Sequence, residues 1–145
     1  MRFFGAMCVL AILGVSDASA RCDGGSATLF SCVTTKGKQI ELCDAGKTIQ
    51  YSFGKPQFKP EIVVTVPRNR ASTSQWAGVG RYMTYSVDVP NGDTIYSVFW
   101  SADKIEQGIE AGVNVLVKGK VAATVNCSER SIDSNLEGVK LKPSE

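Results

Sequence analysis

The chain has 145 residues, of which 16 are Lys or Arg and 14 are Asp or Glu, giving a formal net charge of +2. A balance this close to neutral argues against a basic nucleic-acid-binding arm and against a polybasic membrane patch. The chain contains no histidine, which removes the commonest general base and the favoured zinc and copper ligand, and with them most hydrolase templates.

The first 20 residues have the pattern of a secretory signal peptide. A basic start at Arg2 is followed by an apolar stretch over residues 3–15 and by Ala-Ser-Ala at residues 18–20, which matches an A-x-A cleavage site. The apolar stretch is shorter than the roughly 20 residues that span a membrane, so we expect cleavage rather than anchoring. Residues 21–145 then form a single domain that is periplasmic or secreted and not inserted in a membrane.

Four cysteines follow the cleavage site, an even number that predicts two disulfides in an exported domain: Cys22, Cys32, Cys43 and Cys127. Three connectivities are possible. We expect Cys32–Cys43, because both residues flank one predicted hairpin and can share a face, with Cys22–Cys127 as the second bridge. The alternative is a four-thiolate zinc site, but the sequence has no C-x-x-C pair, and we expect no metal.

The first half of the domain alternates strand patterns with turn signals. A Lys-Gly-Lys turn at residues 36–38 divides residues 29–46 into two strands. Residues 48–53 alternate apolar and polar side chains, which is typical of a half-buried strand. Residues 61–66 form a β-branched run between two prolines, which predicts a strand buried on both faces at its centre.

The second half contains two hairpin patterns. Residues 83–100 alternate around a Pro-Asn-Gly-Asp turn, and residues 113–127 repeat the pattern around a Lys-Gly-Lys turn. Between them, residues 101–112 predict the one short helix, with Asp103 as its N-cap. The tail, residues 136–143, predicts a short edge strand. The sum is an all-β fold of seven or eight strands, an antiparallel meander forming a small barrel or a sandwich.

Residues 68–81 lack apolar periodicity and predict a loop of about a dozen residues, a length that is uncommon unless the loop is functional or mobile. Arg and Trp are the residue types most enriched among binding hot spots. We therefore predict a recognition loop whose contacts are made by Arg68, Arg70, Gln75, Trp76 and Arg81. The alternative is that Trp76 caps the core and the arginines are solvated.

Two further patterns suggest other chemistry. Tyr96 and Trp100 alternate along one face of a predicted strand, where an exposed aromatic row can stack on sugar and a covered one belongs to the core. Carboxylates near the same hairpin could pair for hydrolysis, although such residues more often lie in turns or cap helices: Asp88, Asp93, Asp103 and Glu106.

The patterns "LFSC", "LCD", "YSFG" and "NGDT" resemble small exported β-domain proteins of Gram-negative bacteria. The stretch "WAGVGRYMTYSV", followed by "SVFW", is similar in layout to the membrane-bound and periplasmic inhibitors of c-type lysozyme. That resemblance implies an eight-stranded, disulfide-closed β-barrel with a lysozyme partner. In that family a Ser precedes the Gly of the motif, and here Ala77 precedes Gly78.

These observations predict a non-enzymatic binding or inhibitor protein that acts on an envelope enzyme, such as a peptidoglycan hydrolase, or that serves as an immunity protein against a toxin. We expect a protein partner, no nucleic acid and no cofactor. One alternative is a carbohydrate- or envelope-binding structural domain, and another is a carboxylate-based hydrolase.

Overall fold

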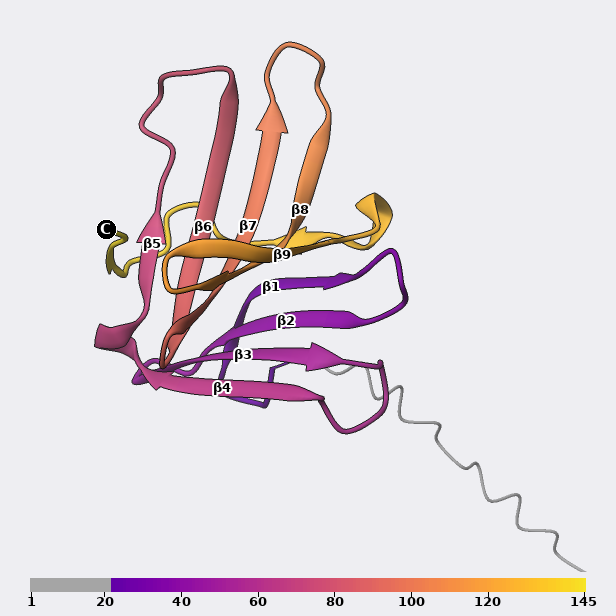
Figure 1. Ribbon diagram of the computed structural model, residues 1–145, viewed down its shortest axis with the longest axis vertical. Helices are drawn as coiled ribbons and strands as arrows, with labels where there is room; N and C mark the ends of the chain where they lie inside the picture. Colours follow the sequence, from indigo (N-terminus) through magenta and orange to yellow (C-terminus); the bar gives the residue numbers. More distant parts are fainter. Residues whose placement is uncertain (1–21) are drawn as a thin grey trace, which may run out of the picture.

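The computed structural model describes residues 22–145, so the predicted signal peptide lies outside the described residues. The fold is all-β, as predicted, and its strands form two sheets (Figure 1). The elements in chain order are β1 (Ala27–Val33), β2 (Gln39–Asp44), β3 (Thr48–Gly54), β4 (Ile62–Pro67), η1 (Arg68–Arg70), β5 (Ser72–Ser74), β6 (Tyr82–Asn91), β7 (Thr94–Asp103), β8 (Ile109–Val117), β9 (Lys120–Asn126), η2 (Glu129–Ser131), β10 (Asp133–Ser134) and β11 (Lys142–Pro143). The described residues form eleven strands instead of the seven or eight predicted, because β5, β10 and β11 are strands of two or three residues, too short to show a periodic pattern in the sequence, and β11 pairs in parallel with β5.

The first sheet has the order β10-β1-β2-β3-β4 and the second has the order β11-β5-β6-β7-β8-β9. The strands of the first sheet run across β6 and β7, which stand upright in Figure 1. Crossed packing of this kind joins two twisted sheets around one core. Each sheet has two free edges within residues 22–145, so the described chain is a two-sheet sandwich and not the closed barrel that was the alternative.

In the first sheet, alternate residues face the core. Phe30 lies opposite Leu42 and Cys32 opposite Ile40, and all four side chains are buried. The pairing of β1 with β2 shifts between Thr28 and Phe30, which is a β-bulge. The bulge sets which residues of β1 face inward.

The second sheet contributes the other half of the core. Val87 and Val98 are directly paired on β6 and β7 and are fully buried, and Val113 continues the row on β8. The predicted turn at residues 90–93 is confirmed, since Asn91 pairs with Thr94 across it. Gly92 takes a φ of 60° there, the left-handed region that favours glycine.

Aromatic stacking and a C-terminal segment tie the two sheets together. The rings of Tyr51 on β3 and Tyr96 on β7 stack with centroids 4.7 Å apart. Burial raises the pKa of the Tyr51 phenol well above its usual range. Residues 128–145 cross the molecule, as the yellow segment in Figure 1 shows, and insert the fully buried Leu136 into the core. The segment ends in β11, which pairs in parallel with β5.

Both predicted disulfide pairings are wrong. The bridges are Cys22–Cys43 and Cys32–Cys127. The predicted Cys32–Cys43 bridge fails because the register pairs Cys32 with Ile40 and Cys43 with Thr28, so the two cysteines point to opposite faces. Two disulfides indicate an oxidising, extracytoplasmic environment.

Three predicted local features are also corrected. Residues 101–112 form no helix, because Asp103 closes a turn at residues 104–106 and β8 begins at Ile109. Val63 at the centre of β4 is 53 % exposed, so this strand is buried on one face only. The predicted loop at residues 68–81 contains η1 and β5. No helix among residues 22–145 has the length and apolar character needed to cross a lipid bilayer.

Candidate binding site at the tip of the second sheet

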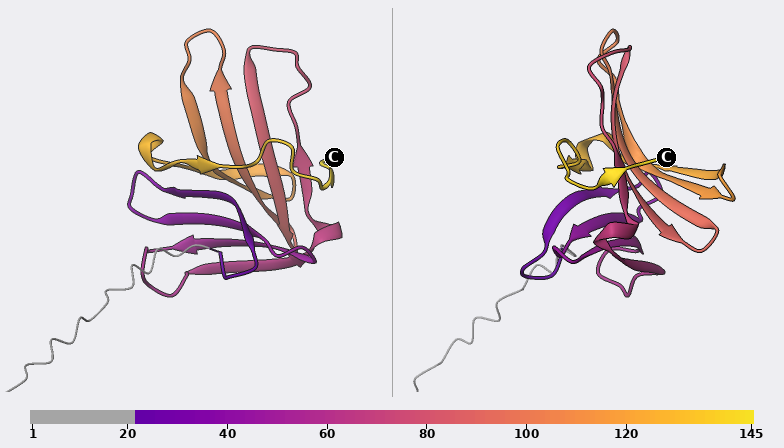
Figure 2. Two further views of the ribbon diagram at one scale, coloured as in Figure 1. Left: turned by 180° about the vertical axis from the view of Figure 1, so that it is seen from behind. Right: turned by 90° about the vertical axis from the view of Figure 1, so that its left-hand side faces the viewer.

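Two chain connections meet at one end of the second sheet. Because β6, β7 and β8 are antiparallel neighbours, the β5–β6 connection (residues 75–81) and the β7–β8 turn (residues 104–108) lie at the same end. A hydrogen bond from the Lys104 amide to the Arg81 carbonyl, 3.0 Å long, joins them. We call residues 76–82 and 103–109, which contain nearly all of both connections and the strand ends next to them, the tip. Figures 1 and 2 show that it projects beyond the first sheet.

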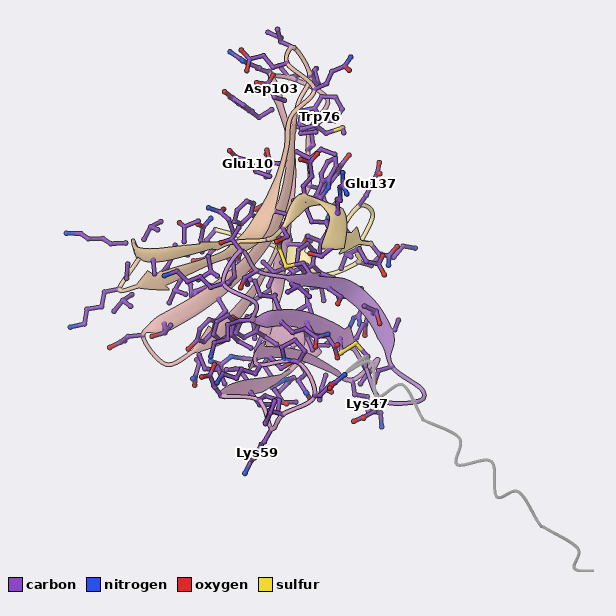
Figure 3. The ribbon with its side chains drawn as sticks, turned by 90° about the vertical axis from the view of Figure 1, so that its right-hand side faces the viewer. Lys47, Lys59, Trp76, Asp103, Glu110 and Glu137 are labelled. Carbon is purple, nitrogen blue, oxygen red and sulfur yellow. A yellow bond between two sulfur atoms is a disulfide. The ribbon has the colours of Figure 1, made fainter. Side chains whose placement is uncertain are left out.

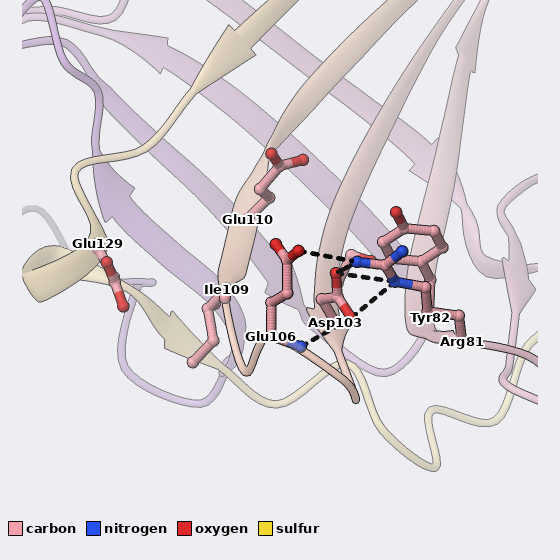
Figure 4. Close-up of a pocket in the computed structure, with 9 residues that line it drawn as sticks. Arg81, Tyr82, Asp103, Glu106, Ile109, Glu110 and Glu129 are labelled. Atoms are coloured by element: carbon pink, nitrogen blue, oxygen red, sulfur yellow. Dashed lines mark hydrogen bonds and ion pairs between the residues drawn. The ribbon is translucent and has the colours of Figure 1, made fainter.

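Asp103 organises the tip. Its carboxylate accepts hydrogen bonds from the Arg81 guanidinium at 3.0 and 2.6 Å, and from the backbone amides of Ile105 and Glu106 at 2.9 and 3.2 Å. Glu106 lies 3.5 Å from the same guanidinium (Figure 4). The Arg81 hydrogen bond is the main cause that holds the pKa of the Asp103 carboxyl far below its usual range, against the opposing effect of burial. Asp103 therefore serves as a fixed anion and not as a proton donor at neutral pH.

We expect the Asp103 carboxyl to stay ionised at pH values below the ordinary titration range of an aspartate, because its folded-state pKa lies far below the unfolded value of about 3.9. The stabilisation from this ion pair is present above the unfolded-state pKa and is lost only as the pH falls through the folded-state value. The measurement is the ¹³C chemical shift of the carboxyl carbon as a function of pH. The variant Arg81→Gln should move the titration up toward the ordinary range, and a normal aspartate titration in the wild type would refute the assignment.

Trp76 lies on the other half of the tip, as Figure 3 shows. It is half-buried against the core, its indole N–H donates to the Val79 carbonyl at 3.0 Å, and the Lys104 ammonium lies 4.7 Å from the centre of its ring. Trp76 thus fixes the shape of the β5–β6 connection. The alternative that Trp76 caps the core and the prediction that it belongs to a recognition surface are both compatible with this position.

The tip exposes several large apolar side chains. Val79 is 82 % exposed, Ile105 is 71 % exposed and Tyr82, at the start of β6, is 57 % exposed. Ile109, where β8 begins, is also exposed. Isolated exposed apolar side chains are ordinary on a protein surface, so the feature of interest here is that several of them occur on two adjoining loops.

A pocket of about 480 Å³ opens beside these side chains (Figure 4). Four carboxylates line it, those of Asp103, Glu106, Glu110 and Glu129, against the single guanidinium of Arg81. Because Arg81 is engaged by Asp103 and Glu106, the pocket is acidic, although the whole chain carries a net charge of +2. We call it the tip pocket. It complements a cationic group on a partner.

The five predicted binding residues lie in different parts of the structure. Trp76 and Arg81 lie at the tip. Arg68 lies at the other end of β5, where its guanidinium pairs with Asp44 at 2.6 Å and donates to the Lys140 carbonyl at 2.9 Å. Arg70 is exposed beside it in η1. Gln75 bonds the C-terminal segment, because its side chain donates to the Leu136 carbonyl and accepts from the Gly138 amide.

The structure also gives the positions of the predicted aromatic row and of the carboxylates considered for hydrolysis. Tyr96 and Trp100 are half-buried against the core, where the Tyr96 ring stacks on Tyr51 and the Trp100 ring lies near Tyr85. Asp93 and Asp103 flank the ten residues of β7 at opposite ends, about 30 Å apart at ~3.3 Å per residue, too far for a hydrolytic carboxylate pair. Asp88 instead accepts a hydrogen bond from Ser144 at 2.7 Å. Asp103 and Glu106 come together, both facing Arg81.

The sequence interpretation missed Ile105 because it assigned residues 104–108 to a helix. It missed Val79 and Tyr82 because it selected the Arg, Gln and Trp residues of the predicted loop as the contacts. The sequence also carried a signal for a turn. An Asp whose side chain can accept from the backbone amides that follow it, with Gly108 shortly after, is a common turn pattern. Cys22, Glu41 and Cys43 are the described side chains that cluster like metal ligands, but both thiols are consumed in the disulfide.

Comparison with known proteins gives no match: no family model, no curated protein and no solved structure is significantly similar to this chain.

Proposed function

We propose that this protein is a non-enzymatic binding or inhibitor protein of the periplasm or the extracellular space, and that the tip engages a cationic envelope enzyme such as a peptidoglycan hydrolase. The observation that carries the proposal is the group of exposed apolar side chains on two adjoining loops, Val79 and Ile105 above all, beside the acidic tip pocket. An apolar centre with a charged margin is the usual composition of a protein-binding surface.

The rigidity of the tip supports a role in binding. The Asp103–Arg81 hydrogen bonds, the Lys104–Arg81 backbone bond and the Trp76–Val79 bond hold both loops in place before any partner arrives. A preorganised surface loses less conformational entropy on association, so more of its contact energy becomes affinity. An inhibitor that inserts two loops into an enzyme cleft gains from this arrangement.

The charge of the tip pocket favours a cationic partner. Glu110 and Glu129 line the pocket without a cationic side chain of the described chain bonded to them. The resemblance to inhibitors of c-type lysozyme names one cationic partner to test first. An anionic lipid surface is disfavoured, because it would bring phosphate groups against these carboxylates.

The test is direct binding and inhibition by the oxidised domain, residues 21–145, of a purified c-type lysozyme and of a panel of cationic peptidoglycan hydrolases. We expect a saturable complex whose affinity falls with rising salt. The double variant Val79→Ser, Ile105→Ser should weaken it at least about tenfold, because apolar hot-spot residues each contribute more than about 1 kcal/mol.

The matched control is Phe58→Ser, Val121→Ser, which removes two side chains that are 72 % and 60 % exposed but lie away from the tip, on the β3–β4 connection and on β9. This control should bind like the wild type. The proposal fails if no member of the panel binds, or if the tip variant and the control lose affinity equally.

A further inference from the structure

The outward face of the second sheet carries an open groove of about 600 Å³. Its walls come from alternate residues of β6, β7, β8 and β9, the ones that point away from the core. It adjoins the tip pocket and shares Tyr82, Ser101 and Glu110 with it. We call it the outer groove. Its volume lies within the range of ordinary ligand sites.

Short hydroxyl and amide side chains form the floor of the outer groove. Thr84 and Ser101 are hydrogen-bonded to each other at 2.9 Å across β6 and β7, and Thr124 donates to the Asn114 side-chain carbonyl at 2.7 Å across β8 and β9. The second bond fixes the Asn114 amide and leaves its NH₂ group able to donate to a ligand. Ser97 on β7 lies directly opposite Asn114 and extends the row of the second pair.

The outer groove carries fewer charged side chains than a typical protein surface. Of the ten residues that line the outer groove, Glu110 is charged and none is Lys or Arg. Protein surfaces are typically a quarter to a third charged. A ligand held on this floor gains hydrogen bonds to neutral groups, and Glu110 repels an anion. The Arg81 guanidinium, which lies at the Tyr82 ring, is already paired with Asp103 and Glu106.

Two aromatic side chains complete the groove, Tyr82 near the tip and Phe99 on β7. The register pairs Tyr82 with Asp103 and Ser86 with Phe99, so the two rings are four residues apart along the strands, about 13 Å at ~3.3 Å per residue. The Arg81 guanidinium lies over the Tyr82 ring, 5.3 Å from its centre, which fixes this ring in place. The span between the rings exceeds a single sugar ring.

We propose that the outer groove binds an uncharged oligosaccharide of more than one sugar ring. Sugar rings present C–H faces that stack on aromatic side chains and hydroxyls that pair with neutral donors and acceptors, which is the combination that Phe99, Tyr82 and the polar floor supply. Phosphorylated and uronic-acid glycans are disfavoured, because Glu110 repels an anion and the Arg81 guanidinium beside Tyr82 is already paired with Asp103 and Glu106. The outer groove shares Tyr82 with the tip, but Phe99 and the polar floor lie outside it, and the proposal does not rest on the function proposed for the tip.

The test is an NMR titration of the ¹⁵N-labelled oxidised domain with chitotetraose, with cellotetraose and with tetragalacturonate as the anionic counterpart. We expect saturable shifts along β6 to β9 with at least one neutral oligosaccharide and none with tetragalacturonate. Ser97→Arg, which places a long cation across the floor, should weaken binding at least about tenfold, and Asn114→Ala should weaken it measurably.

The matched control is Thr65→Arg, an equivalent substitution on the outward face of β4 in the first sheet. It should bind like the wild type, as should the tip variant Val79→Ser, Ile105→Ser. Native-like dispersion of the variant spectra shows that the fold is intact. The proposal is overturned if neither neutral oligosaccharide binds, if tetragalacturonate binds equally well, or if a folded Ser97→Arg keeps full affinity.

Discussion

Replacing Cys32 and Cys127 together with alanine should destabilise the domain by about 4.7 kcal/mol and lower its melting temperature by roughly 10–20 °C. The bridge spans 95 residues and joins β1 in the first sheet to the end of β9 in the second. Its removal restores the conformational entropy of almost the whole unfolded chain, because the entropy lost on closing a loop grows with loop length. Cys32 is also buried, so its loss leaves a small cavity.

The control is the Cys22→Ala, Cys43→Ala double variant. That bridge spans 21 residues, so the same relation gives about 3.4 kcal/mol. Thermal unfolding of both variants should rank them in this order, and the reverse order would contradict the assigned connectivity. Mapping the bridges of the wild type requires chymotrypsin as well as trypsin, since Cys22 and Cys32 share one tryptic peptide and cleavage after Leu29 or Phe30 separates them.

The second large effect is expected at Gly112. A Cβ placed on this residue would overlap the Val125 carbonyl oxygen, a backbone atom of the neighbouring strand β9 that cannot rotate away. Gly112→Ala must therefore push β8 and β9 apart, and we expect a loss of about 3 kcal/mol or more, at the upper end of the range for overpacking. Urea unfolding monitored by tryptophan fluorescence measures this loss.

Gly108→Ala is the matched control for Gly112. No atom lies within 4 Å of a Cβ placed on Gly108, and its φ is outside the region that disfavours side chains. Its effect on the free energy of unfolding should stay within about 1 kcal/mol. If Gly112→Ala were as harmless as Gly108→Ala, β9 would not approach β8 as closely as the structure places it.

The hairpins were predictable because their signals are local. The β6–β7 pair follows from ten alternating residues on each side of an Asn-Gly turn, and the β8–β9 pair follows from the Lys-Gly-Lys turn at residues 118–120. The helix prediction at residues 101–112 failed because Asp103 satisfies two backbone amides in a turn as readily as at a helix start. The capping role of the Asp103 side chain was predicted correctly, but the backbone that it caps is a turn and not a helix.

The disulfides and the binding surface depend on long-range geometry that the sequence pattern does not carry. The register of the β1–β2 turn, which pairs Cys32 with Ile40, decides which way Cys32 points, and its partner Cys127 comes from the end of the other sheet. In the same way, Ile105 joins Val79 at the tip only because β6, β7 and β8 are adjacent. The sequence-predicted loop contributed Trp76 and Arg81, whereas Arg68 and Gln75 bond other parts of the fold.

The central claim is that the tip is a protein-recognition surface. Hydrogen–deuterium exchange of the wild-type oxidised domain, alone and mixed with a c-type lysozyme or another cationic peptidoglycan hydrolase that it inhibits, tests this most directly. The account predicts new protection at residues 76–82 and 103–109, with no change around Phe58 or Val121. Protection confined to the first sheet, or no protection with any enzyme of the panel, would contradict it.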